Sequence, residues 1–263
     1  MDLTSVGVRN RIINGDMMID QRYCGSATAN TINGYTVDRW YLAQSPVGKI
    51  IGQRSTSTPP IGFNYYYRVT SQSAFTVGAG DVYNFQQGVE ADNIRDLQWG
   101  TANAKGIVLS FWVRSSLTGT FSGWVHNPTD TRSYVFNYTI AAANTWQYVS
   151  VVIPGDTSGT WTTGGNTVGL RVGFCLGVGS SFQTPSVGSW QSNGALASTS
   201  SVSLVGTSGA TLDVTGVQFE VGAVATPFEL RDFTSELLRC QRYYQKSYRY
   251  DVSPGTAAGN AIA

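Results

Sequence analysis

Residues 106–114 constrain the fold of this chain more than any other stretch, because they combine a long apolar run with regular alternation. Successive side chains of a strand point to opposite faces. The face expected to pack into a core carries Leu109, Phe111 and Val113. The opposite face carries a mixed set: Val108, Ser110, Trp112 and Arg114. β-Branched and aromatic residues predominate, so we expect a strand here and not a buried helix.

Comparable runs follow one another along the chain as far as residue 232. They predict strands at residues 35–42, 63–69, 82–90, 120–126, 134–140, 146–153, 170–176 and 211–221. The segment 45–62 contains Pro46, Pro59 and Pro60, and we expect it to be mostly loop because proline cannot donate to a sheet. Many short strands without a helical pattern predict an all-β fold, a two-sheet antiparallel sandwich with jelly-roll topology preferred.

The charge content excludes several classes of partner. Only 13% of the 263 residues are charged and the net charge is +1, so we expect no attraction to nucleic acid or to a membrane surface. No stretch reaches the roughly 18 apolar residues of a membrane span, and the first residues lack a signal-peptide pattern. These features predict a soluble protein made in a cytoplasm. Three cysteines at wide spacing predict neither a disulfide framework nor a zinc site.

Three parts are expected along the chain: a jelly-roll domain over residues 1–232, a helix over 233–250, and a flexible tail or linker over 251–263. Thr234 or Ser235 is the expected helix cap, with Glu236 in the first turn. A stripe with heptad-like spacing runs along this helix through Phe233, Leu237, Cys240, Tyr244 and Ser247. The stripe is compatible with packing on the β-domain and with self-association, and both interpretations stay open.

Motifs along nearly the whole chain resemble those of a family of bacteriophage tail-fibre and virion appendage proteins. They lie at residues 10–17 (NRIINGDM), 19–22 (IDQR), 35–40 (YTVDRW), 96–102 (DLQWGTA) and 109–114 (LSFWVR). The most specific are residues 215–222 (TGVQFEVG), 225–229 (ATPFE) and 236–244 (ELLRCQRYY). The resemblance implies a sandwich similar to carbohydrate-binding modules, and residues 146–151 (WQYVSV) also look like such a module. No catalytic or binding residue transfers with these motifs.

The resemblance implies a structural part of a virion, a tail fibre or similar appendage. Such a protein would contact other virion proteins and, through its glycan-binding-like module, the host surface. It also implies a homo-oligomer, with a trimer favoured, and the helical stripe is one expected contact. The alternative hypothesis is a purely architectural component, such as a head decoration or fibre-attachment protein, that binds no glycan.

The residues that carry chemistry argue against an enzyme. His126 is the sole histidine, lies beside the Asn127-Pro128 turn without a flanking acid, and is expected to be a surface or turn residue. Pairs of acids such as Asp92 and Asp96 have nothing to mark them as a hydrolytic pair, and no cofactor is expected. Structural Ca²⁺ near the chain ends is a lesser hypothesis, with ligands drawn from Asp16, Asp20, Glu220 and Glu229.

The aromatic residues give the better indication of function. Seven tryptophans and fourteen tyrosines exceed what one core usually needs, and sugars are recognised by rings lying against their apolar faces with polar groups at the edge. If the relevant strands share one sheet, the face opposite the core collects the glycan-binding candidates Tyr66, Arg68, Trp112, Arg114, Tyr148 and Arg171. The arginines would favour acidic sugars. Packing of that face on another subunit or under loops is the competing interpretation.

Overall fold

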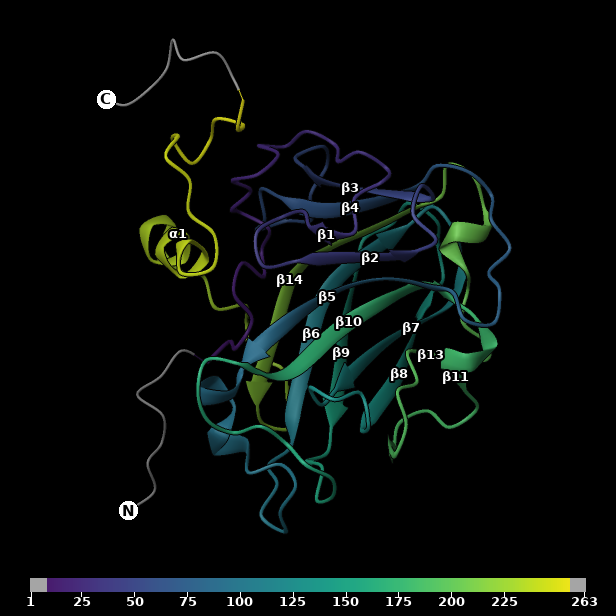
Figure 1. Ribbon diagram of the computed structural model, residues 1–263, viewed down its shortest axis with the longest axis vertical. Coiled ribbons are helices and arrows are strands. Elements are labelled where there is room, and N and C mark those ends of the chain that lie inside the picture. The colour runs from purple at the N-terminus through teal and green to yellow at the C-terminus, as the bar shows by residue number, and fades with distance from the viewer. Residues whose placement is uncertain (1–8, 256–263) are drawn as a thin grey trace.

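The computed structural model describes residues 9–255, which form two antiparallel sheets packed face to face (Figure 1). The seven-stranded sheet has the order β1 (Gly34–Tyr35), β2 (Tyr41–Ser45), β5 (Val82–Glu90), β10 (Val168–Val178), β7 (Gly119–His126), β8 (Ser133–Ile140) and β12 (Trp190–Gln191). The five-stranded sheet has the order β3 (Ile50–Ser55), β4 (Tyr66–Ser71), β14 (Thr211–Val221), β6 (Ile107–Ser115) and β9 (Gln147–Ile153). The predicted jelly-roll sandwich is confirmed. A small parallel pair, β11 (Gln183–Thr184) with β13 (Ala197–Ser198), lies outside both sheets.

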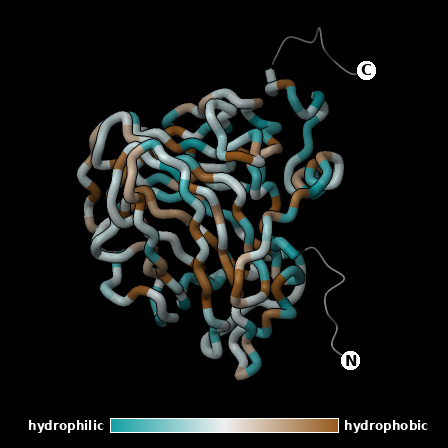
Figure 2. The backbone as a smooth tube through the Cα atoms, turned by 180° about the vertical axis from the view of Figure 1, so that it is seen from behind, coloured by the Kyte–Doolittle hydropathy of each residue, from teal (hydrophilic) through white to brown (hydrophobic). Residues whose placement is uncertain are grey.

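The core lies between the two sheets and is built as the alternation predicted. Phe111 of β6 is fully buried, and its ring meets that of Phe174 from β10 edge-on at 4.9 Å between centroids. Leu109 and Val113 flank Phe111 in the same core. Figure 2 shows hydrophobic backbone segments along the central strands, whereas most of the connecting loops are paler or hydrophilic. Burial of these rings and aliphatic chains is the main contribution to stability.

The segment 45–62 is mostly loop, as expected, but it contains one strand that was not expected, and the expectation of a single strand at residues 35–42 was wrong. The segment 45–62 contains β3, because its prolines lie on either side of Ile50–Ser55 and leave those residues free to pair with β4. The single strand expected at 35–42 is instead two strands joined by a tight turn, in which Arg39 adopts a left-handed backbone (φ 73°) and Trp40 N–H donates to Val37 C=O. Elsewhere the expected strands appear, and β5 and β14 have the expected bounds.

Helix α1 (Phe233–Gln241) is shorter than the helix expected over residues 233–250. Its cap is Asp232, whose carboxylate accepts from Ser235 N–H at 3.0 Å, and not Thr234 or Ser235. After the helix, Tyr243 and Tyr244 contact Arg39 and Arg22, whose guanidinium carbons lie 3.4 and 3.7 Å from the ring centroids. These cation–π contacts hold residues 243 and 244 against the β-domain, directly after the helix ends at Gln241. No helix formed by residues 9–255 is long and apolar enough to cross a membrane.

The stripe on α1 packs on the chain's own β-domain. Cys240 is 1% exposed and lies with Ile13 and Ile19, and Leu237 packs against the same cluster. The stripe does not continue beyond the helix, so Tyr244 and Ser247 are not part of one helical face. Of the expected tail, residues 251–255 form turns and loop, and residues 256–263 lie outside the described part.

Segments from both ends of the chain meet beside the sandwich, where α1 lies (Figure 1). The Asn10 side chain donates to Val217 C=O and accepts from Phe219 N–H, both at 3.0 Å. Asn14 N–H donates to Glu236, and the Asn14 side chain donates to Asp38 C=O. The motifs at residues 10–22, 35–40 and 236–244 therefore build one clasp that fixes the chain ends.

Candidate functional site

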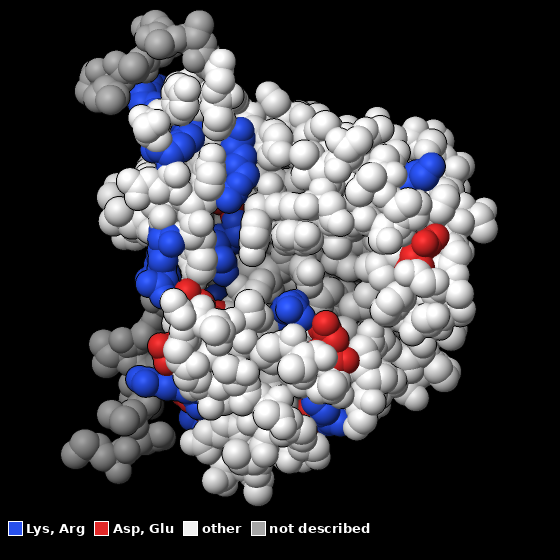
Figure 3. Space-filling view, in the orientation of Figure 1, with Lys and Arg blue, Asp and Glu red and all other residues white. Residues whose placement is uncertain are grey.

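A groove of about 660 Å³ lies on the outer face of the seven-stranded sheet. This side of the molecule is hollowed near its centre, and its Lys and Arg side chains gather mostly along the left of the view, with only a few charged side chains elsewhere (Figure 3). The groove is lined by Tyr35, Tyr41, Ala43, Val82, Asn84, Gln86, Gly88, Trp124, His126, Asp130, Val168, Arg171, Phe182, Gly194 and Leu196.

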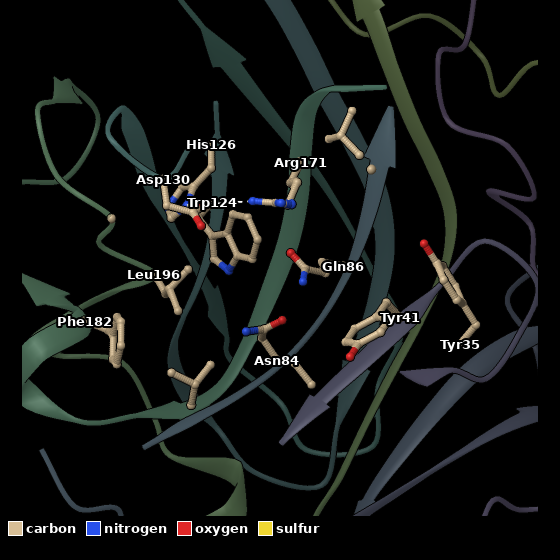
Figure 4. Close-up of a pocket in the computed structure, with 15 residues that line it drawn as sticks. Tyr35, Tyr41, Asn84, Gln86, Trp124, His126, Asp130, Arg171, Phe182 and Leu196 are labelled. Carbon is tan, nitrogen blue, oxygen red and sulfur yellow. Dashed lines mark hydrogen bonds and ion pairs between the residues drawn. The ribbon is translucent and has the colours of Figure 1, made fainter. Parts of the chain in front are cut away.

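Strand register explains why these side chains meet, since directly paired residues point to the same face. One row runs across four strands from Tyr41 through Gln86 and Gly173 to Trp124. A second row runs through Gly88 and Arg171 to His126. Figure 4 shows the indole of Trp124 and the amides of Asn84 and Gln86 around one space, between the tyrosines on one side and Phe182 and Leu196 on the other.

The floor of the groove depends on a glycine. A Cβ atom on Gly173 would come within 2.3 Å of Cζ2 of Trp124, so the indole occupies the space that a side chain at 173 would need. Trp124 is only 2% exposed in this position. Its N–H and the carbonyl oxygen of the Asn84 side chain have no hydrogen-bond partner among residues 9–255. Buried polar groups are usually paired, so this donor and this acceptor at the floor are available for a hydrogen bond to a ligand.

A cluster of three ionisable side chains closes one end of the groove. Arg171 Nη1 donates to Asp130 Oδ1 at 2.9 Å and to Pro128 C=O at 3.1 Å. His126 Nδ1 lies 3.1 Å from the same Asp130 oxygen. Burial opposes ionisation of Asp130, but the hydrogen bond from His126 and the charge of Arg171 outweigh it and lower the pKa of that carboxyl. The charges of Arg171 and Asp130 therefore compensate each other within the groove.

His126 is not the surface histidine that the sequence suggested. It is 1% exposed, and Asp130 supplies the acid that appeared to be missing. Its Nε2 lies 2.7 Å from Ala195 C=O, next to the groove residue Leu196. Both ring nitrogens thus face oxygen atoms of the protein. His126 therefore holds the loop that carries Leu196 in the groove wall. The sequence near His126 could not predict this contact, because Ala195 is 69 residues away.

The predicted set of glycan-binding residues is divided between the two sheets, which corrects the expectation of one shared face. Arg171 belongs to β10, which pairs with β5 and β7 in the seven-stranded sheet. The other five predicted residues lie in β4, β6 and β9 of the five-stranded sheet: Tyr66, Arg68, Trp112, Arg114 and Tyr148. The reason is the strand order, since β10 has no pairing with β4, β6 or β9.

Three of those five residues are engaged within the protein. Arg68 and Arg114 both bind Asp213, whose side chain is 1% exposed, through four nitrogen–oxygen contacts of 2.7–2.8 Å. Tyr66 is fully buried, and its ring meets Trp146 edge-on at 5.4 Å. Its hydroxyl donates to Ser57 C=O at 2.6 Å. These residues form a buried cluster around one carboxylate and do not present free groups to a ligand.

Trp112 and Tyr148 line a separate hollow of about 470 Å³ on the outer face of the five-stranded sheet. Their ring centroids are 5.6 Å apart, and Phe63 and Phe228 line the same hollow.

A β-bulge at Gly216 lies beside this hollow. The register of β14 against β6 shifts between Thr215 and Gln218, where Gly216 has a φ of 62°. A Cβ atom there would come within 2.6 Å of Phe63, so this bulge requires glycine.

The calcium site considered near the chain ends does not form among residues 9–255, where no three or more His, Cys, Asp or Glu side chains gather. The expected ligands have other partners. Asp20 accepts from Tyr23 and Gly25 N–H, Glu220 accepts from Thr226, and Glu229 accepts from Asn10 N–H. Asp92 and Asp96 likewise bind Gly165 N–H and Arg11, respectively.

Comparisons with known proteins give likenesses of fold only. No family model and no curated protein matches the chain. Similar solved structures include a putative sugar-binding protein from Bacteroides thetaiotaomicron, with a TM-score of 0.45, 10% identity and coverage of 81% of this chain and 100% of that chain. TmCBM61 in complex with β-1,4-galactotriose has a TM-score of 0.39, 8% identity and coverage of 82% and 100%. The enzymatically active domain of bacteriophage CBA120 tailspike protein 4 has a TM-score of 0.42 and 13% identity, and the match covers 81% of this chain and 21% of that one. At these scores the ligands of those proteins do not transfer to this chain.

Proposed function

We propose that the groove on the seven-stranded sheet binds a glycan. The observation that carries the proposal is the row from Tyr41 through Gln86 to Trp124, in which a half-buried tyrosine and a half-buried amide lie beside the buried indole that forms the floor. Aromatic surfaces suit the apolar faces of sugar rings, and amides can both donate to and accept from hydroxyls. Gln86 is half-buried, and no hydrogen bond occupies its side chain among residues 9–255.

The charge of the groove bears on the kind of sugar. Arg171 is the one arginine of the predicted set that lines the groove, and Asp130 holds it in an ion pair. The arginines Arg68 and Arg114 are bound to Asp213 on the other sheet. The preference for acidic sugars was expected because free arginines would bind their carboxylates. All three arginines already have carboxylate partners in the protein, so this reason no longer applies. We therefore expect neutral sugars to bind the groove at least as well as acidic ones.

We further propose that the protein is a structural part of a bacteriophage virion, a tail fibre or similar appendage, and uses the groove to attach to the host surface. The support for this role is the set of sequence motifs described above. In the structure, the motifs at residues 10–22, 35–40 and 236–244 build the clasp, and of their residues only Tyr35 lines the groove. These motifs are therefore mainly scaffold, and the side chains of the groove floor come from outside them. An architectural part without glycan binding is the alternative that the test must distinguish.

The test is direct binding of the purified full chain to a glycan array, followed by calorimetry with any glycan retained. Gln86→Ala and Tyr41→Ala should each reduce affinity by about tenfold or more, which corresponds to roughly 1.4 kcal/mol. Trp112→Ala, in the hollow of the opposite sheet, is the matched control and should leave affinity unchanged. Failure of the parent chain to retain any glycan contradicts the proposal and favours the architectural alternative. Release of shortened sugars from a retained glycan would instead identify an enzyme.

A further inference from the structure

The two sheets have four edge strands, and three of these are protected. Exposed edges pair readily with other chains, and proteins limit this with short strands, charges or covering segments. β1 and β12 are only two residues long. β3 carries Arg54, and a preceding loop covers its edge, since Thr28 N–H donates to Gly52 C=O and Gly52 N–H donates to the Thr28 hydroxyl. The fourth edge, β9, has none of these protections.

β9 (Gln147–Ile153) is a long, uncharged and partly apolar edge. Tyr148 is 47% exposed and Val152 is 52% exposed, and Ser150 between them is also exposed. Val149 and Val151 on the core-facing side are only half-buried. Among residues 9–255, the backbone of β9 pairs with β6 alone. The outward backbone groups of the strand are therefore free to pair with another strand.

The surrounding sequence lacks charge over an unusual length. Residues 133–155 contain no Asp, Glu, Lys or Arg, although 13% of the chain is charged and about three such residues would be expected in a run of this length. A charged residue on β9 would be the simplest protection against edge pairing. Its absence from this edge, when the other edges are protected, indicates that β9 has a pairing partner.

We propose that the partner is β9 of a second copy, paired antiparallel about a two-fold axis that passes through Ser150. The order Tyr148-Val149-Ser150-Val151-Val152 is complementary to itself in this register. Tyr148 of each copy lies opposite Val152 of the other, and Val149 lies opposite Val151. Cross-strand pairs of aromatic and β-branched residues stabilise a sheet, and the small serine sits where the two strands meet. The pairing joins two five-stranded sheets into one continuous sheet and is isologous.

The shifted register centred on Val151 places Tyr148 opposite Pro154, which has no N–H to donate. The Ser150-centred register avoids this and covers both exposed side chains of the edge. Neither the groove nor α1 belongs to this edge, so the dimer leaves the proposed glycan site open. The inference does not depend on the proposed function.

The first experiment measures the mass of the full chain by light scattering and sedimentation at tens of micromolar. The parent should have twice the mass of the monomer. Ser150→Lys should have the mass of the monomer, because the two lysines would lie opposite each other at the axis and repel. Ser208→Lys, the same change at an exposed turn, is the control and should leave the dimer intact. Mixing Ser150→Lys with Ser150→Asp should restore a dimer that neither variant forms alone. A monomeric parent, the trimer that the resemblance implies, or a dimer that Ser150→Lys does not affect overturns the proposal.

The second experiment tests the register. Ser150→Cys in a Cys24→Ser background should form a disulfide between copies under mild oxidation, because opposed residues of antiparallel strands lie within disulfide range. Cys175 and Cys240 are buried and should not compete. Cross-linking with retention of the native fold supports the two-fold pairing. Dissociation by Ser150→Lys without cross-linking through residue 150 rules out this register.

Discussion

The indole of Trp124 lies against the backbone of Gly173 on the neighbouring strand, at a distance that no other residue at position 173 would allow. The ring is buried there, and the amides of Asn84 and Gln86 lie around the same space (Figure 4). The shape of the groove floor therefore requires glycine at position 173, where any side chain would collide with the indole.

Gly173→Ala should therefore raise or tilt the Trp124 ring and lower the affinity of the groove for any glycan it binds. The added methyl group overpacks a close contact, and such changes typically cost about 1–3 kcal/mol of stability. Denaturant unfolding measures this cost, and calorimetry measures the affinity. Gly206→Ala is the control, because a Cβ atom there meets nothing closer than 3.6 Å. Unchanged binding by a folded Gly173→Ala variant would show that the ring position is unimportant.

The buried Asp213 cluster gives a prediction about stability. Asp213→Ala leaves Arg68 and Arg114 without their shared carboxylate, and breaking a buried pair in this way costs about 3–5 kcal/mol. The control is Asp251→Ala, which breaks an exposed pair with Arg249 and should cost much less, because solvent screens such pairs. Urea unfolding of both variants at one pH compares them. A loss at Asp213 no larger than that at Asp251 would mean that the cluster does not stabilise the sheet.

The strands could be predicted from sequence because alternation is a local property. β5 and β14 have their expected bounds, and the buried face of β6 carries the expected Leu109, Phe111 and Val113. The groove could not be predicted in this way, since its rows of side chains cross four strands that are far apart in the chain. Nothing near Arg171 indicates which sheet β10 joins, and nothing near Asp213 indicates that it receives two arginines. β3 was not predicted, because the prolines on either side of Ile50–Ser55 indicated a loop over the whole segment.

Asp16 gives a prediction about pH. Burial, reinforced by the nearby Glu236, raises the pKa of this carboxyl from 3.8 to about 6 in the folded protein. A raised pKa favours the protonated folded state, so this contribution is fully present below pH 3.8 and is lost as the pH rises to about 6. Asp16→Asn should thus be more stable than the parent above pH 6, by about 3 kcal/mol, with the difference vanishing below pH 3.8. Thermal unfolding of both chains across this range checks the sign. A constant difference would show that Asp16 does not titrate as described.

Host adsorption distinguishes the two aromatic surfaces. If the protein is a virion appendage, virions carrying Gln86→Ala with Tyr41→Ala should adsorb much more slowly than the parent, because both changes remove groove contacts. A single site with millimolar affinity contributes about −4 kcal/mol, and several copies on one particle raise the effective affinity by roughly 10²–10⁴. Weakening every copy therefore reduces adsorption steeply. Virions carrying Trp112→Ala, which alters the hollow on the other sheet without changing the β9 edge, should adsorb normally. The opposite pattern would move the receptor site to the hollow, as the sequence suggested, and normal adsorption by both would favour a purely architectural protein.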